Sequence, residues 1–329
     1  MIGLAIAWRA AGAGMKVELH ERGSELGRGS SQAAGGMLAP VAEADAQEPE
    51  VLALGQAAAA AWPAFAAELE AATDLLVGYR RSGTLLVARD PDEAAWAERE
   101  AELRRHLGLA VEPLLGSQAR AREPGLTPRL RGAVSLPDDH SVEPRAVVAA
   151  LAEACRRADV VIHTGSEVSD LAGLDAGCVV NARGAWSGEP VRPVKGQALM
   201  LRDPGGPGLI ERVLRWAVPI PGYLVPRGDG RYYLGATAEE QGFNEAVTVL
   251  ALHDLLRDAA ELVPGLLELE LQETVVGFRP ATPDNRPLIG PDPSDDRIFR
   301  ATGHFRGGVL MAPVTAEMVV AELVRGVAA

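Results

Sequence analysis

Two stretches near the C-terminus decide the fold. Residues 275–291 read VVGFRPATPDNRPLIGP, and residues 297–324 read RIFRATGHFRGGVLMAPVTAEMVVAELV. Each stretch carries an arginine, Arg279 or Arg306, on a turn rich in glycine and proline. The planar guanidinium of an arginine can bind both oxygens of a carboxylate at once. The alternative is that both arginines are ordinary surface residues.

The apolar spacing after the second turn predicts a helix over residues 312–324, with Val314, Met318, Ala321 and Val324 as its apolar face. The glycine pair at 307–308 leaves the N-terminal end of this helix sterically open. Unpaired N–H groups and the helix dipole make such an end a site for an anion or an electron-rich ring. The C-terminal region therefore predicts a binding site for a negatively charged group.

Composition and charge bound the class of protein. The chain has 329 residues, enough for a large core and two domains. Its 45 acidic and 32 basic residues give a net charge of −13, which argues against a nucleic-acid partner and against an anionic membrane surface. Cys155 and Cys178 are expected to be buried and inert, so the reducing cytoplasm is the natural compartment. The histidines at 20, 106, 140, 163 and 253 show no clustered spacing, and we expect no metal site.

Alternating helix and strand patterns indicate an α/β protein. Periodicity predicts helices over 2–13, 48–72, 91–106, 144–157 and 247–262. It predicts strands over 16–20, 80–89, 133–136, 160–163, 178–181, 197–201, 216–225, 231–236 and 274–278. The order favours a βαβ cofactor-binding domain assembled from three separated segments, with a mostly antiparallel α+β domain inserted twice.

Two local features fit a nucleotide cofactor. Residues 29–39, GSSQAAGGMLA, are small and rich in hydroxyl groups and backbone donors, which a loop needs in order to approach phosphates and a flat ring. Glu21 ends the strand predicted at 16–20, where a carboxylate can bind a ribose hydroxyl. The alternatives are a plain surface linker and a solvated glutamate.

Short motifs along the whole chain add a resemblance to these features. They run in one order from the N-terminus to the C-terminus: Ser30-Ser31 with 34–40 (AGGMLAP), 142–145 (VEPR), 184–187 (GAWS), 195–197 (KGQ), 235–237 (GAT), 277–280 (GFRP), 282–284 (TPD) and 303–308 (GHFRGG). The ordered set resembles the flavin-dependent D-amino-acid oxidase superfamily, and most closely the glycine oxidases of thiamine biosynthesis.

The beginning of the chain departs from that family. Its members open with an apolar strand and a G-x-G-x-x-G turn, which lets the backbone approach the cofactor pyrophosphate. This chain begins MIGLAIAW, which resembles the last glycine of that turn and the helix after it. We expect that the chain is truncated relative to the family, that the first strand of the Rossmann-like domain is missing, and that Met1 is an internal codon of a longer reading frame.

The resemblance implies noncovalent FAD and two domains. Residues 1–76, 142–190 and 280–329 would form the FAD-binding domain, and 77–141 and 191–279 the substrate domain. The cofactor-binding residues would be Ile2, Gly3, Glu21, Arg22, Ser30, Ser31, Gly35, Gly36, Met37, Val168, His304, Phe305, Arg306, Gly307, Gly308, Val309 and Leu310.

The resemblance also implies three catalytic residues. Arg279 would clamp the substrate carboxylate, Arg306 would support the substrate near its Cα, and the hydroxyl of Tyr223 would reach the substrate. The alternative for Tyr223 is a packing role between strands.

The activity implied is oxidation of glycine or a similarly small amino acid by hydride transfer to FAD. O2 would reoxidise the flavin and yield H2O2, and the imine or glyoxylate would feed thiazole synthesis for thiamine. Two alternatives stay open, namely a D-amino-acid or amine dehydrogenase that reduces a quinone and a truncated, flavin-free pseudo-enzyme. The resemblance leaves open a homo-oligomer.

Overall fold

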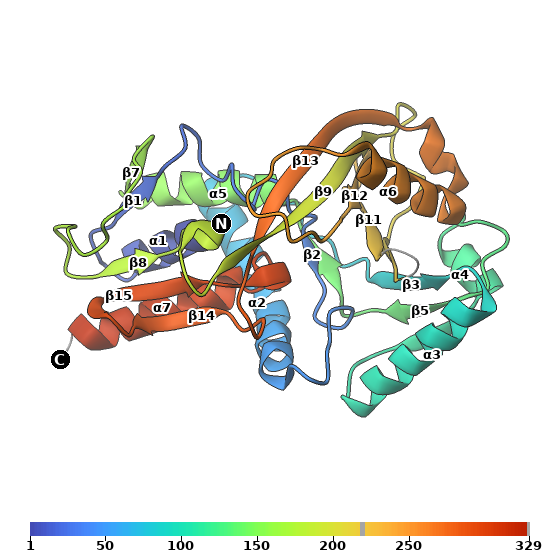
Figure 1. The fold of residues 1–329 in the computed structure, drawn as a ribbon, viewed down its shortest axis with the longest axis horizontal. Coiled ribbons are helices and arrows are strands. Elements are labelled where there is room, and N and C mark those ends of the chain that lie inside the picture. The colour runs from blue at the N-terminus through green and yellow to red at the C-terminus, as the bar shows by residue number, and fades with distance from the viewer. Residues whose placement is uncertain (218–220, 328–329) are drawn as a thin grey trace.

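The computed structural model of the protein describes residues 1–217 and 221–327, and its fold is mixed α/β, as the sequence predicts (Figure 1). The helices are α1 (Ile2–Gly12), α2 (Pro49–Thr73), α3 (Pro91–His106), α4 (Gly116–Arg122), α5 (Pro144–Arg157), α6 (Val249–Leu262) and α7 (Ala312–Val327), with 3-10 turns η1 (Gly184–Trp186), η2 (Pro264–Glu268) and η3 (Phe305–Gly307). The strands are β1 (Glu18–Glu21), β2 (Met37–Leu38), β3 (Thr84–Ala88), β4 (Glu112–Leu115), β5 (Gly132–Leu136), β6 (His140–Ser141), β7 (Val161–Thr164), β8 (Val179–Asn181), β9 (Arg192–Arg202), β10 (Val213–Trp216), β11 (Gly222–Pro226), β12 (Arg231–Gly235), β13 (Glu270–Ala281), β14 (Leu288–Asp292) and β15 (Asp295–Thr302).

Helices α1, α2, α5 and α7 build the core of one half of the molecule. Helix α1 packs against α5 and α7, and α2 packs against the same two helices. Small side chains allow this close approach, because Ala5 on α1 is fully buried beside the larger Trp62, Leu151 and Val319. Within the described part of the chain, no helix is both long and apolar enough to cross a bilayer.

Short parallel pairs of strands lie beside these helices. Strand β1 runs parallel to β7, whereas β8 runs parallel to β15 in a separate three-stranded sheet completed by β14. The carboxyl ends of parallel strands are where α/β folds bind ligands, and Glu21 and Asn181 end β1 and β8. Side chains from both strands, including Leu19 and Val180, line one cavity between the two sheets.

The other half of the molecule is built on an eight-stranded sheet with the order β13-β9-β12-β11-β10-β3-β5-β4. Its neighbouring strands pair antiparallel except for β10 and β3. The sheet is therefore mostly antiparallel, as predicted. The long strand β13 pairs with β9 along its whole length and extends toward the α-helical half (Figure 1), and its last residues include Arg279. The domain boundaries stay predictions.

Most elements lie where the sequence pattern predicts them. Helices α3 and α5 have the predicted bounds, whereas β4 and α4 were not predicted. Only Leu114 of β4 is buried, so the strand shows no alternation of apolar residues. The strand predicted at 216–225 is wrong, because β10 and β11 are two antiparallel strands. Its part at 218–220 lies outside the described residues.

Two predictions about burial are wrong. On α7, Met318 and Val324 are 44% and 45% exposed, while Ala316 and Val319 are buried. Helix α7 enters the core with its first turn, which is buried on every side, and so the simple stripe of apolar residues does not describe it. Cys178 precedes β8 and is exposed, whereas Cys155 is buried in the core as expected.

Gly36 holds the loop at 29–39 against the chain between β6 and α5. It has a left-handed φ of 76° and directly precedes β2, which pairs with β6. A Cβ at this position would lie 2.2 Å from the carbonyl oxygen of Val142 and 2.8 Å from Cδ of Pro144. Both the positive φ and the lack of space for a Cβ therefore require glycine at position 36.

We predict that Gly36→Ala lowers the free energy of unfolding by roughly 2–4 kcal/mol, because it adds an unfavourable φ and a clash with backbone. Urea unfolding followed by circular dichroism measures the change. Gly12→Ala is the control, because a Cβ at that helical position has nothing within 4 Å, and it should change stability by less than about 1 kcal/mol. Equal unfolding midpoints for Gly36→Ala and wild type would contradict the role of Gly36.

Candidate active site

One cavity of about 2360 Å³ passes between the two halves of the molecule. All of the residues predicted to bind the cofactor or the substrate line it: Ile2, Gly3, Glu21, Arg22, Ser30, Ser31, Gly35, Gly36, Met37, Val168, Tyr223, Arg279, His304, Phe305, Arg306, Gly307, Gly308, Val309 and Leu310. The structure thus brings together residues that are up to about 300 positions apart in the sequence, while the role of each residue stays a proposal.

The loop at 29–39 forms one wall of the cavity and has no room for larger side chains. A Cβ on Gly35 would lie 2.7 Å from Cε2 of Tyr223, and a Cβ on Gly277 of β13 would lie 2.6 Å from Cβ of Ala33. The hydroxyl of Ser30 donates to the carbonyl oxygen of Phe278. The loop and β13 therefore press their backbones together, which leaves backbone groups facing the cavity.

Glu21 and Arg22 lie at the carboxyl end of β1. The Oε1 atom of Glu21 accepts a hydrogen bond of 2.9 Å from the backbone N–H of Gly23, which fixes the carboxylate at the rim of the cavity. The guanidinium of Arg22 lies 3.7 Å from the ring centroid of Trp186. The backbone carbonyl of Val168 accepts a hydrogen bond of 3.3 Å from Arg183. This end of the cavity therefore has the strand-end carboxylate that a ribose requires.

The turn from His304 to Leu310 closes the opposite wall. His304 is buried, its Nε2 lies 3.0 Å from the hydroxyl of Thr315, and burial lowers its pKa to about 4, so its ring is neutral near pH 7. The indole of Trp62 donates a hydrogen bond of 2.8 Å to the carbonyl of Leu310. The turn and the start of α7 are therefore held rigidly, with the positive end of the helix dipole beside the cavity.

Arg279 and Tyr223 lie together at the substrate end. The Nη1 atom of Arg279 donates a hydrogen bond of 2.9 Å to the carbonyl of Thr237, and its guanidinium packs against Gly196, where a Cβ would lie 2.7 Å from it. The ring of Tyr223 stacks on that of Tyr233 at 5.8 Å between centroids. Both proposed roles of Tyr223, packing and substrate contact, fit this position.

Sequence reasoning missed Glu43 and Arg215, which also line the cavity. Their side chains form an ion pair, and Nη1 of Arg306 lies 3.5 Å from Oε2 of Glu43. Burial disfavours the charged carboxylate, but the positive charges of Arg215, Arg306 and Arg279 outweigh it and lower the pKa of Glu43. The sequence held two signals for this pair: an acidic residue inside the apolar run at 37–44 and an arginine inside the buried strand β10.

The segment that precedes Glu43 is fixed on both sides by buried charged residues. The carboxylate of Asp139 accepts hydrogen bonds from the backbone N–H groups of Val41 and Ala42, and the guanidinium of Arg104 donates to the carbonyl oxygens of the same two residues. Burial raises the pKa of Asp139 to about 7. These contacts satisfy the buried backbone and place Glu43 opposite the arginines.

The histidines show no clustered spacing in the sequence, but the fold brings His20 and His163 together. Their rings stack with centroids 4.7 Å apart, because the parallel pairing of β1 and β7 sets them directly opposite each other. A separation of 143 positions hides this contact in the sequence.

The cavity fits a flavin dinucleotide. Glycines at 35, 36 and 277 let the loop at 29–39 pack closely on its neighbours along the cavity wall, Glu21 lies at the end of β1, and the N-terminal end of α7 places its positive helix dipole beside the cavity. Its volume exceeds that of a typical drug-sized pocket, as an elongated dinucleotide with a substrate beside it requires. The fold and the cavity together define a flavin-binding oxidoreductase.

Comparison with known proteins supplies the family. Residues 1–322 match the family DAO, described as FAD dependent oxidoreductase. The chain belongs to this family, and FAD is its cofactor.

Two known proteins and one solved structure illustrate the similarity. A glycine oxidase of Geobacillus kaustophilus is 32% identical over 349 residues, which span 98% of this chain and 90% of that protein. The crystal structure of glycine oxidase from Geobacillus kaustophilus matches with a TM-score of 0.90 at 32% identity, covering 98% of this chain and 92% of that one. The bifunctional protein ThiO/ThiG of Synechocystis sp. is 32% identical over 97% of this chain, which spans only 49% of that protein.

We predict that FAD leaves the protein on acid denaturation, because neither cysteine is suited to a covalent bond with the flavin ring. Cys155 is buried on α5, where burial raises the pKa of its thiol to about 12, and it contacts the carbonyl of Leu4. Cys178 precedes β8, and no cysteine follows it in the part of the chain that carries the proposed flavin-facing turn from His304 to Leu310. After precipitation with acid, flavin absorbance should remain in the supernatant. Flavin colour in the washed pellet would contradict noncovalent binding.

Proposed function

We propose that the chain oxidises glycine or a similarly small amino acid in the cytoplasm. The substrate loses two electrons and two protons to give an imine, which water converts to a 2-oxo acid and ammonia. O2 receives the two electrons and two protons and leaves as H2O2. The imine or its hydrolysis product would serve thiazole synthesis for thiamine.

One observation carries this proposal: Arg279 lies in the same cavity as the flavin-type glycine loop, with donors left for a second partner. Its hydrogen bond to Thr237 uses Nη1, and no other hydrogen bond of its guanidinium is found among the described residues. A substrate carboxylate can therefore accept two hydrogen bonds from the remaining N–H groups. An α-amino acid held in this way has its Cα next to the carboxylate and thus close to the wall that the loop at 29–39 forms.

Glu43, Arg215 and Arg306 set the electrostatics around such a substrate. Glu43 neutralises much of the positive charge of the two neighbouring arginines, so that Arg279 is left as the main attraction for a carboxylate. Arg306 is held by Glu43 and lies against Phe305, at 4.9 Å from that ring. We infer that Arg306 supports the substrate from the side while Arg279 fixes its carboxylate.

The remaining chemistry needs few protein groups. FAD, when bound, would supply the two-electron acceptor for the hydride of the substrate Cα. The protein positions the substrate, and the positive end of the α7 dipole favours negative charge beside the cavity. A substrate amine must be neutral when the hydride leaves, and the net positive charge that Arg215, Arg279 and Arg306 retain after pairing with Glu43 favours loss of its proton.

The relatives support the choice of reaction and of pathway. Proteins named glycine oxidase match this chain over nearly its full length. The chain matches about half the length of a protein named ThiO/ThiG. It also matches a protein of Rhizobium etli that is named a thiamine biosynthesis oxidoreductase. Both matches support a role in thiamine synthesis.

Oxidase activity is distinguished from quinone reduction by the electron acceptor. We predict that purified protein loaded with FAD consumes O2 when glycine is added and releases an equal amount of H2O2. An oxygen electrode and a peroxidase-coupled assay measure the two. Turnover with a soluble quinone analogue but not with O2 would favour the dehydrogenase, and protein that retains no FAD after loading would favour the flavin-free alternative.

We predict that Arg279→Ala raises the KM for glycine at least 30-fold, because a charge-assisted bidentate contact in a partly dry site contributes on the order of 2–4 kcal/mol. Arg279→Lys should restore little, since an ammonium lacks the planar fork. Flavin content, measured by absorbance, should not change in either variant.

The control is Arg105→Ala, which removes an exposed arginine of α3 whose ion pair among the described residues is with Glu102. It should leave KM and kcat unchanged. An Arg279→Ala protein with the KM of the wild type would show that another group binds the carboxylate.

A further inference from the structure

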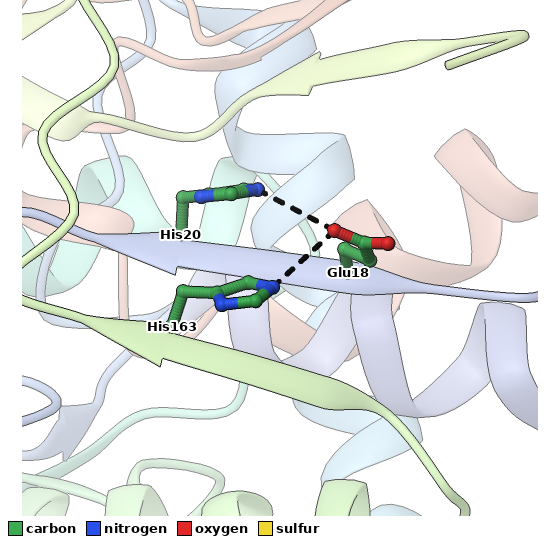
Figure 2. Close-up of side chains that lie close together, drawn as sticks. All are labelled: Glu18, His20 and His163. Atoms are coloured by element: carbon green, nitrogen blue, oxygen red, sulfur yellow. Dashed lines mark hydrogen bonds and ion pairs between the residues drawn. The ribbon is translucent and has the colours of Figure 1, made fainter. Parts of the chain in front are cut away.

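Glu18, His20 and His163 form a cluster on the outer face of the β1–β7 pair. Figure 2 shows the two imidazole rings side by side, both reaching toward the carboxylate of Glu18. Side chains two positions apart on a strand share a face, so Glu18 and His20 lie on one face of β1, and the register sets His163 beside His20. The alternate residues Leu19 and Ile162 pack on the hydrophobic core, so the cluster lies on the opposite face, where Glu18 and His20 also line the open cavity.

The ligand atoms of the three side chains converge. Nε2 of His163 lies 3.3 Å, and Nε2 of His20 3.9 Å, from the same oxygen, Oε2 of Glu18. One nitrogen or oxygen atom from each residue lies within 4.8 Å of the other two. Bonds of about 2.0–2.2 Å to a tetrahedral Zn²⁺ hold ligand atoms about 3.3 Å apart. Small side-chain rotations therefore bring all three atoms to coordination distance.

Ser166 fixes the orientation of one of the rings. Its hydroxyl lies 2.9 Å from Nδ1 of His20, which directs the Nε2 atom of that ring toward Glu18. In metal sites the second ring nitrogen of a ligating histidine usually has such a partner, which holds the ring and its tautomer. The cluster therefore has two imidazole ligands, one carboxylate ligand and one oriented ring.

We propose that Glu18, His20 and His163 bind a divalent first-row transition-metal ion, Zn²⁺ in particular, at the surface of the β1–β7 pair. Two nitrogens and one carboxylate oxygen suit such ions better than Mg²⁺ or Ca²⁺, which prefer oxygen ligands. Water would occupy the remaining positions. The ion would clamp β1 to β7.

The clamp is linked to the nucleotide end of the cavity. Glu21 ends β1, and its carbonyl accepts a hydrogen bond from the backbone N–H of Ser166, the residue that also holds His20. Val168 follows two positions later and lines the cavity. A metal at the cluster therefore fastens the two segments that carry Glu21 and Val168, whatever substrate the protein oxidises.

The test is a titration of the full chain, carrying Cys178→Ser so that the exposed thiol does not bind metal, with ZnCl2 in a calorimeter. We expect about one Zn²⁺ per chain and a rise in the melting temperature at saturation, since an ion that binds only the folded state stabilises it. Co²⁺ should bind with the visible absorption of a site containing nitrogen ligands.

Variants locate the site. His20→Ala, His163→Ala and Glu18→Gln should each weaken Zn²⁺ binding at least tenfold, and Ser166→Ala by roughly tenfold, through loss of ring orientation. The matched control is His106→Ala, because His106 and Glu102 form an exposed pair at 3.3 Å that lacks a second histidine. It should bind Zn²⁺ as the parent does. Circular dichroism before each titration checks that every variant is folded.

Two results would overturn the proposal. One is a parent protein that shows no saturable binding of Zn²⁺ or Co²⁺. The other is a folded His163→Ala protein that binds as tightly as the parent. Because neither measurement involves glycine or O2, failure here is separate from failure of the proposed oxidase activity.

Discussion

The close approach of backbone to backbone around the glycine loop is the constraint on which the cavity depends. At Gly36 the loop meets the carbonyl of Val142, and at Ala33 it meets Gly277 of β13, with no space for a side chain at either glycine. The first contact joins the loop to the segment before α5, and the second joins it to the long strand that carries Arg279. The position of the loop at 29–39 relative to Arg279 thus follows from two contacts that only glycine permits.

The second constraint is charge in a partly dry cavity. Glu43 has a net lowered pKa despite burial because three arginines surround it, and the buried Asp139 and Arg104 fix the backbone that leads to it. The side chains of Glu43 and Arg215 are 28% and 20% exposed, so removal of one partner destabilises the protein less than the loss of one member of a fully buried pair would. The main effect of the Glu43–Arg215 pair is therefore on the electrostatic field that a carboxylate meets in the cavity, and its effect on stability is smaller.

The sequence predicted the features with strong local signals. Helices α3 and α5 begin at a proline after an acidic N-cap and have the predicted bounds, and the residues predicted for the site all line one cavity, while their roles stay predictions. The predictions failed for elements and contacts that depend on tertiary pairing. Strand β4 buries a single residue, and α7 is surrounded by protein at its first turn, so neither shows a simple period. Glu43 with Arg215, and His20 with His163, meet across 172 and 143 positions, and no spacing rule reports such a contact.

The hydrogen bonds that build the cavity join opposite ends of the chain. Ser30 contacts Phe278 and Trp62 contacts Leu310, and each pair is 248 positions apart. During synthesis, the early segments must therefore wait for nearly the entire polypeptide before their partners leave the ribosome. Cofactor insertion is consequently a late event in the life of each molecule, and a nascent chain exposes an unfinished binding surface until then.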